Sequence, residues 1–266
     1  LAVARLVLNT GHRMVYPFLP TFARGLGVDL EAIALMVTAR SGLGLISPVF
    51  GAFADARGRK NAMLAALLLF AASMALVSLW PTYPALFVAL LLASSAKLLY
   101  DPSMQAYIGD RVQYTRRGLA IAITELSWSG AFLLGIPLLG WLIARADTWR
   151  APFVPLALAG LGASILVWRL LPADEPLAVR RPSLAQGART VLAHPTALAG
   201  LGLSMLMNLS NETIGIVYGA WMEDAFGLQV AALGAASAVI GLAELGGEGL
   251  VAGVVDRVGK RRAVAA

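Results

Sequence analysis

The stretch that decides the fold is Gly51–Met63, GAFADARGRKNAM, a cluster of charges between two long apolar runs. The run before it covers 31–54 and the run after it covers 61–80, each close to the 20 residues or so that a helix needs to cross a bilayer. Leu and Ala dominate both runs. The charged segment is therefore expected to be a short loop that joins two membrane-spanning helices.

The same alternation continues along the chain. It predicts eight spans, at 1–22, 31–54, 61–80, 84–108, 118–144, 151–171, 196–222 and 229–254. Polar breaks with prolines separate them, such as WPTYP (80–84) and LPADEP (171–176). The strands of a transmembrane barrel would be about ten residues long with alternating polarity, and that alternation is absent. An all-α membrane protein is predicted.

Composition agrees with a membrane protein and argues against a soluble one. Of the 266 residues 59% are hydrophobic and only 14% are charged, whereas soluble domains carry about 25% charged residues. The net charge of +6 could indicate a nucleic-acid binder, but no basic stripe follows an amphipathic element, so no nucleic-acid partner is expected. Cysteine is absent, which excludes disulfides and thiolate metal sites. Neither a metal nor a cofactor is expected.

The basic residues gather on one side of the predicted membrane. If the N-terminus is cytoplasmic, fourteen of the 21 fall in cytoplasmic loops and three, Arg24, Arg145 and Arg150, fall in the opposite loops. The remaining four, Arg5, Arg13, Arg40 and Lys97, lie in or at the start of apolar runs. Cytoplasmic loops of membrane proteins carry such an excess. The pattern predicts a multi-pass protein of the cell inner (plasma) membrane with its N-terminus in the cytoplasm.

Residues 172–195 form the one long polar interruption. We expect a cytoplasmic linker there, between an N-terminal six-helix bundle (1–171) and the start of a second bundle (196–266) with two helices. Within the linker, PSLAQGARTVLAHP (182–195) predicts a short amphipathic helix with Ser183 as its N-cap.

The chain repeats its layout after 200 to 202 residues. VYPFLPTFARGLGVDL (15–30) aligns with VYGAWMEDAFGLQV (217–230), and each is followed by an apolar run that ends in Asp-x-x-Gly-basic-basic. Internal repeats are frequent in secondary transporters, whose substrate sites lie near the membrane midplane between the repeated bundles.

Two motifs carry a resemblance to a known family. GAFADARGRK resembles the loop signature G-x-x-x-D-x-x-G-R-K of the major facilitator superfamily, matched by Gly51, Asp55, Gly58, Arg59 and Lys60, and in a second copy, led by Ala252 in place of Gly, by Asp256, Gly259, Lys260 and Arg261. The run ELSWSGAFLLGIPLLGW (125–141) resembles the helix 5 motif of the family's antiporters through Gly130, Gly135, Pro137 and Gly140, with one residue inserted before the proline.

The resemblance extends over the whole chain and implies the family's properties. It implies twelve helices in two halves, so eight spans would be a fragment: one complete half and the first two helices of the next. It also implies alternating access by a monomer, and resemblance to the drug-efflux branch implies proton antiport. That branch usually carries an Arg in its fourth helix, where the nearest basic residue is Lys97.

Asp55 and Gly58 suggest a role for the loop beyond topology. Basic residues alone would hold the loop in the cytoplasm. A carboxylate at a helix C-terminus, however, faces the unfavourable end of the helix dipole, and Gly allows a positive φ that other residues resist. We expect a cytoplasmic latch, in which Asp55 pairs with a basic group or a helix N-terminus nearby and holds the inner gate shut in the outward-facing state. Loop topology alone is the alternative.

Ionisable groups inside spans are the candidate site residues, because a charge at the bilayer centre costs about 2.5–3.5 kcal/mol on insertion scales. Lys97 and Asp101 lie one helical turn apart on a single face, and Glu125 is expected at the same depth. They form either a neutralising network or a substrate or proton site. The full set expected in substrate binding or proton coupling is Arg13, Arg40, Lys97, Asp101, Glu125, Asn208, Glu212, Glu244 and Glu248.

Three carboxylates of the last two spans extend this set. Glu244 and Glu248, also one turn apart, are expected to share a proton or to be neutralised by an Arg on a helix beyond the chain. Glu212 lies with Asn208 in the most polar patch of any span and is expected to contact substrate from the same cavity as Arg13. The two histidines, His12 and His194, are interpreted as incidental.

These expectations predict a secondary active transporter that moves a small organic solute, with proton-coupled efflux implied by the family resemblance. A uniporter or symporter for a metabolite or sugar is the alternative within the class. Outside it, a receptor or scaffold without transport activity on the same fold stays open. An intramembrane enzyme is disfavoured because H-E-x-x-H, G-x-S-x-G and paired catalytic Asp motifs are absent. The expected partners are the solute, protons and the lipid bilayer.

Overall fold

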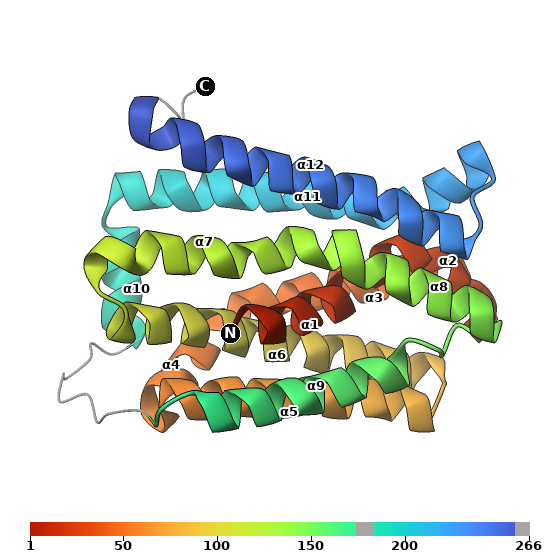
Figure 1. The fold of residues 1–266 in the computed structure, drawn as a ribbon, viewed down its shortest axis with the longest axis horizontal. Helices are drawn as coiled ribbons and strands as arrows, with labels where there is room; N and C mark the ends of the chain where they lie inside the picture. The colour runs from red at the N-terminus through yellow and green to blue at the C-terminus, as the bar shows by residue number, and fades with distance from the viewer. Residues whose placement is uncertain (174–183, 259–266) are drawn as a thin grey trace.

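The computed structural model describes residues 1–173 and 184–258, and within these ranges every regular element is a helix. Figure 1 shows the helices lying side by side along the long axis of the molecule. The elements are α1 (Ala2–Arg13), α2 (Val15–Leu26), α3 (Leu30–Ser41), η1 (Gly42–Ile46), α4 (Ser47–Arg57), α5 (Arg59–Leu79), α6 (Tyr83–Arg111), α7 (Tyr114–Gly130), η2 (Ala131–Gly135), α8 (Ile136–Ala146), α9 (Phe153–Leu170), α10 (Leu184–Leu192), α11 (Pro195–Phe226) and α12 (Val230–Val258).

The predicted all-α fold is confirmed, and each of the eight predicted spans is helical over most of its length. Six helical stretches in the described ranges are long and apolar enough to cross a membrane: Leu30–Ala54, Arg59–Leu79, Tyr83–Arg111, Arg116–Ala146, Phe153–Leu170 and Val230–Leu250. The predicted spans 1–22 and 196–222 fall outside this set. The first is divided into α1 and α2, and α11 carries the polar patch of Asn208–Glu212 in its middle.

Three of the predicted spans contain a break in regular α-helix. The first breaks at Met14, just before Pro17, whose ring nitrogen has no hydrogen to donate. The second passes through the 3₁₀ segment η1, which contains two glycines and is followed by Pro48. The fifth contains the single π-helical segment η2 in the described part of the chain, between α7 and α8. The spans therefore bend rather than run straight.

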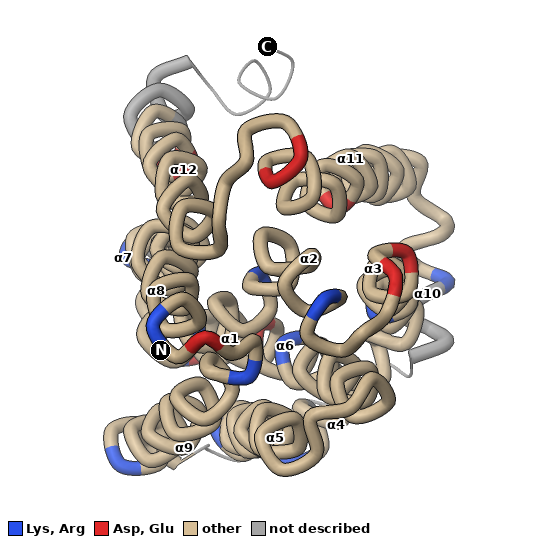
Figure 2. Tube along the Cα trace, turned by 90° about the vertical axis from the view of Figure 1, so that its right-hand side faces the viewer, with Lys and Arg blue, Asp and Glu red and all other residues tan. Residues whose placement is uncertain are grey.

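Helices α1 and α6 lie at the centre of the first part of the chain. Helix α5 lies against α6 and α9, while α1 contacts α6, α7 and α9. Seen end-on in Figure 2, α11 stands beside α2, and α12 stands beside α7 and α8. The loops at 27–29, 147–152 and 227–229 lie at one end of the molecule, on the right in Figure 1, which we name the α11–α12 end. The opposite end, with Gly58 and α10, we name the linker end.

The repeat predicted from the sequence has a local structural counterpart. Gly27 and Gly227, 200 positions apart, end α2 and α11 with φ of 65° and 63°, and each N–H bonds back to a carbonyl of the last turn. This left-handed helix ending is typical of glycine. The next helices then begin at Leu30 and Val230, again 200 positions apart.

Large aromatic side chains fill the interior, and aliphatic side chains cover much of the outside. Phe18, Phe22, Phe70, Phe153 and Tyr100 are almost completely buried. Large exposed apolar residues recur along the outer helix faces, including Leu35, Leu134, Trp141, Leu158 and Leu242. An outer surface so rich in apolar side chains suits contact with lipid.

Candidate substrate cavity and its ion pairs

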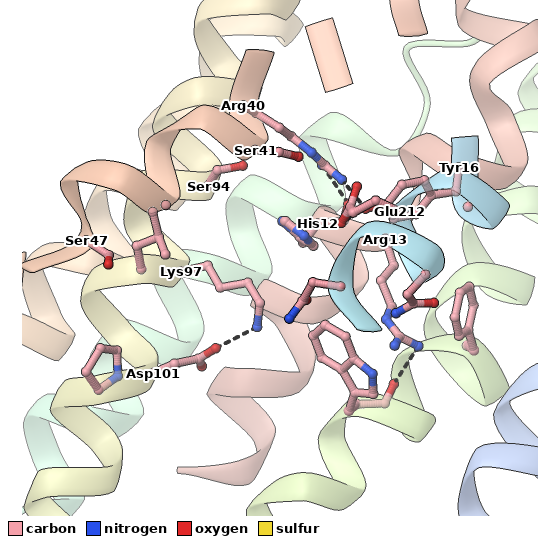
Figure 3. Close-up of a pocket in the computed structure, with 18 of the residues that line it drawn as sticks. His12, Arg13, Tyr16, Arg40, Ser41, Ser47, Ser94, Lys97, Asp101 and Glu212 are labelled. Atoms are coloured by element: carbon pink, nitrogen blue, oxygen red, sulfur yellow. Dashed lines mark hydrogen bonds and ion pairs between the residues drawn. The ribbon is translucent and has the colours of Figure 1, made fainter. Parts of the chain in front are cut away.

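A cavity of about 650 Å³ lies between the first, second, fourth and fifth spans and α11. Figure 3 shows its lining side chains pointing toward one another from different helices. Of the predicted site residues, six line it: Arg13, Arg40, Lys97, Asp101, Asn208 and Glu212. The other three, Glu125, Glu244 and Glu248, lie behind the lining, where each contacts another polar residue.

Arg5 joins the charges of the fourth and fifth spans into one network. Its guanidinium lies 3.1 Å from Asp101 and 2.7 Å from Glu125. Lys97 pairs with Asp101 at 2.7 Å and donates a 2.5 Å hydrogen bond to Asn9. The structure thus brings Lys97, Asp101 and Glu125 together, with Arg5 as the link. Two cations and two carboxylates neutralise one another, which offsets the cost of burying them.

A second ion pair connects the first span to the eighth. Arg13 donates three hydrogen bonds of 2.9 to 3.0 Å to both carboxylate oxygens of Glu244. Its guanidinium also stacks 3.8 Å from the Trp128 ring centroid and 4.1 Å from that of Phe132. This contact corrects one expectation, because the arginine beside Glu244 lies on α1 within the chain, 231 residues away in sequence. Glu248 accepts a hydrogen bond from Ser129 at 3.2 Å.

A third group of charges consists of Arg40 and Glu212, which both hydrogen-bond to the Tyr16 hydroxyl. Arg40 donates to the hydroxyl of Tyr16 at 2.6 Å and to the carbonyl of His12 at 2.9 Å. The same Tyr16 hydroxyl donates to Glu212 at 2.8 Å. Figure 3 shows Arg40, Tyr16 and Glu212 meeting at the upper wall of the cavity. Neither charge has an oppositely charged partner within 4 Å among the described side chains.

The helix 5 motif lies where neighbouring backbones approach closely. A β-carbon on Gly135 would lie 2.2 Å from the Thr10 hydroxyl, and one on Gly140 would lie 3.0 Å from the Val230 carbonyl. Gly130 faces Leu6 in the same way at 3.2 Å, and Pro137 follows Gly135 at the start of α8. The motif therefore allows the fifth span to pack tightly on α1 and on α12.

The loop signature makes contacts at the linker end. Gly58 has φ of 91° and ψ of 152°, so the expected positive φ is confirmed. Lys60 donates to the carbonyls of Trp168 and Leu171 at the end of α9, at 2.8 and 2.5 Å, and Arg59 lies 3.8 Å from Asp110. Gly51 has open space around its Cα.

The predicted latch depends on side chains that lie outside the described residues. Asp55 and Asp256 lie in helices, but their side chains are outside the described residues, and so are Gly259, Lys260 and Arg261. The latch stays a prediction.

The two last spans also meet the first six through close glycine contacts and through an ion pair at the α11–α12 end. On Gly219, a β-carbon would lie 2.4 Å from the Tyr16 carbonyl, and on Gly241 one would lie 2.7 Å from the Leu133 nitrogen. Arg24 and Glu223 pair at 2.5 Å between the last turns of α2 and α11, at the α11–α12 end. Toward the linker end, the residues of α11 from 198 to 211 are exposed.

Sequence reasoning missed several polar residues of the cavity and of the ion-pair network beside it. Arg5 and Asn9 were not among the candidates, although Arg5, Asn9 and Arg13 repeat every four residues and so share one helix face. That spacing was the available signal. His12, interpreted as incidental, lines the cavity. His194 lies at the exposed start of α11.

Comparison with known proteins places this architecture in a family. The family model described as Major Facilitator Superfamily matches residues 1–266. An uncharacterized MFS-type transporter, YceJ of Bacillus subtilis, is 27% identical over 95% of this chain and 65% of its own length. The multi-drug resistance efflux pump PmrA of Streptococcus pneumoniae is 28% identical over 79% of the chain and 54% of its own length. The chloramphenicol resistance protein of Streptomyces lividans is 26% identical over 67% of the chain and 45% of its length. The chain thus spans about half to two thirds of these relatives.

Proposed function

Because the chain belongs to the Major Facilitator Superfamily, we propose that it is a secondary active transporter that exports a small organic solute by alternating access, coupled to proton entry. The observation that carries the proposal is the cavity. It is lined by the first, second, fourth and fifth spans and by α11, which belong to the two copies of the internal repeat. Rocking of one set of helices against the other would expose such a cavity to each side of the membrane in turn.

The arrangement of contacts supports an inward-facing state. At the α11–α12 end, α2 packs on α11, α8 packs on α12, and the Arg24–Glu223 pair spans the junction. At the linker end α11 is exposed, and the excess of Lys and Arg in those loops favours the cytoplasm. We propose a monomer in the inner (plasma) membrane with a cytoplasmic N-terminus, divided into residues 1–171, the linker 172–195 and residues 196–266.

Efflux is supported by the relatives whose names describe drug resistance or efflux. Proton coupling needs a carboxyl group that can gain and lose a proton during the cycle. Protonation of Asp101, Glu125 or Glu244 would break an ion pair of 2.7 to 3.1 Å. Glu212 contacts only a hydroxyl among the described residues, so it is the cavity carboxyl that we propose as the proton carrier. The latch at Asp55 would then hold the linker end shut in the opposite state.

A test uses proteoliposomes that contain the full chain and an internal pH-sensitive dye. Solutes from a library are added under an imposed pH gradient, and a solute-dependent proton flux is expected. The flux should be lost in Glu212→Gln and kept in Asp224→Asn, a matched change on the same helix at an exposed residue outside the cavity. Equal flux in both variants would contradict the assignment of Glu212, and solute movement unaffected by the gradient would favour the uniporter.

A further inference from the structure

The cavity carries many polar side chains although it lies within apolar spans. Apart from its two glycines, its lining residues are polar or charged except for Leu98, Pro102, Trp128 and Phe132. The rings of Trp128 and Phe132 stack against the guanidinium of Arg13, at 3.8 and 4.1 Å. A solute in this cavity therefore has hydrogen-bonding groups within reach on several helices.

Three buried polar atoms on lining residues have no hydrogen-bond partner among the described residues. They are Nδ1 of His12 on α1, Oγ of Ser94 on α6 and Oε2 of Glu212 on α11. Buried polar groups in proteins are nearly always hydrogen-bonded, because an unmade bond is costly. The three residues line the same cavity from three different helices, so a ligand bound there is a candidate source of the missing partners.

Among the charged residues that line the cavity, two lack an ion-pair partner in the described part of the chain. The others are paired: Lys97 and Arg5 balance Asp101 and Glu125, and Arg13 balances Glu244. Arg40, with 3% of its surface exposed, has the neutral oxygens of Tyr16 and His12 as its hydrogen-bond acceptors among the described residues. Glu212 accepts a hydrogen bond from Tyr16 and from no cation among them. The Tyr16 hydroxyl thus lies between Arg40, which has no carboxylate partner among the described residues, and Glu212, which has no cation partner among them.

We propose that this cavity binds a small zwitterion, with the carboxylate of the solute on Arg40 and its ammonium group on Glu212. An α-amino acid carries these two groups on one carbon, and Arg40 and Glu212 lie close enough to hydrogen-bond to the same Tyr16 hydroxyl. Ser94 and His12 are then available to the polar side chain of the solute. This proposal names the solute class of the transporter and rests on the proposed transport function.

Charge neutrality distinguishes a zwitterion from a simple acid or amine. Arg40 and Glu212 together carry no net charge, so a bound zwitterion leaves the site neutral. A bound acid or amine adds one uncompensated charge in a region of low dielectric, where that charge is costly. Removal of one protein charge should therefore reverse the preference.

The test is equilibrium binding to the full chain purified in detergent, measured as ligand-induced thermal stabilisation. The probes are the amino acids, each beside analogues that lack one charged group. For L-glutamine these are 5-amino-5-oxopentanoate, without the ammonium group, and 4-aminobutanamide, without the carboxylate. At least one amino acid should bind about tenfold or more tightly than both of its analogues, the ratio expected for loss of a charge-assisted hydrogen bond.

Two substitutions should change which of the three probes, the amino acid, the acid or the amine, the cavity prefers. Glu212→Gln should weaken amino-acid binding about tenfold or more and strengthen binding of the acid analogue. Arg40→Gln should weaken amino-acid binding and strengthen binding of the amine. Asp224→Asn, at an exposed residue on α11 outside the cavity, should leave all affinities unchanged. A gain of binding cannot come from misfolding, so these exchanges stay informative if a variant is less stable.

Three results would each overturn the proposal. The first is that no amino acid stabilises the chain. The second is that an acid or amine analogue binds the unaltered chain as tightly as its amino acid. The third is that Arg40→Gln and Glu212→Gln leave both affinity and preference unchanged. Binding as described without any transport would instead contradict the proposed function alone.

Discussion

The buried ion pair between Arg13 and Glu244 gives a quantitative prediction for stability. The Arg13 side chain is 4% exposed and that of Glu244 is 26% exposed, and they share three hydrogen bonds of 2.9 to 3.0 Å. Removal of one member of a buried pair leaves the other charge uncompensated, which typically costs about 3–5 kcal/mol. We expect Arg13→Gln to lower the free energy of unfolding by about 3 kcal/mol, at the low end because Glu244 is partly exposed.

A double-mutant cycle separates this pair from the stacking of Arg13 on Trp128 and Phe132. Arg13→Gln, Glu244→Gln and the double variant are unfolded with sodium dodecyl sulfate and followed by circular dichroism. The double variant should be more stable than the sum of the single changes predicts, by about 2 kcal/mol, because no charge is left unpaired. The same cycle at Arg24 and Glu223 is the control. Arg24 is 61% exposed there, so a coupling of at most about 1 kcal/mol is expected. Additive effects at Arg13 and Glu244 would refute the reasoning.

Three further predictions concern helix packing and the loop signature. Gly219→Ala and Gly241→Ala should each cost about 1–3 kcal/mol in the same unfolding assay, because the new methyl group would meet backbone atoms at 2.4 and 2.7 Å, whereas Gly200→Ala has open space and should be tolerated. Gly58→Ala should cost about 1–3 kcal/mol, since its φ of 91° with ψ of 152° suits glycine alone; an unchanged stability would show that the loop can adopt another conformation. Lys60→Gln should speed amide hydrogen exchange in the last turn of α9, whose carbonyls Lys60 caps, and Arg189→Gln on α10 is a control that should not.

Much of the fold could be predicted because lipid imposes long apolar runs. The runs that became α5, α6 and α9 were located to within a few residues, since their ends coincide with prolines and charges. The breaks inside spans were harder to predict. Pro17 and Pro48 give a local signal for two of them, but the π-helical η2 is set by packing against α1 and α12, which no short sequence pattern records.

The site could be predicted only as a set of candidates. A charge within an apolar run can be recognised from the sequence, as Lys97 and Glu212 were. Its partner depends on the tertiary structure. The pairing of Arg13 with Glu244 joins positions 231 residues apart, and local spacing cannot give it. Arg5, near the start of the first run, was not among the candidates. In the structure it faces inward and binds two carboxylates.

The central claim is that two sets of helices rock about the cavity. The chain has no cysteine, so pairs of spin labels can be placed without altering native thiols. One pair, at Asp29 and Gln229, reports on the α11–α12 end, and the other, at Gln113 and His194, reports on the linker end; all four residues are exposed. Double electron–electron resonance in nanodiscs at low and high pH should show the two distances changing in opposite directions. Distances that stay fixed at both ends, or that lengthen together, would contradict alternating access.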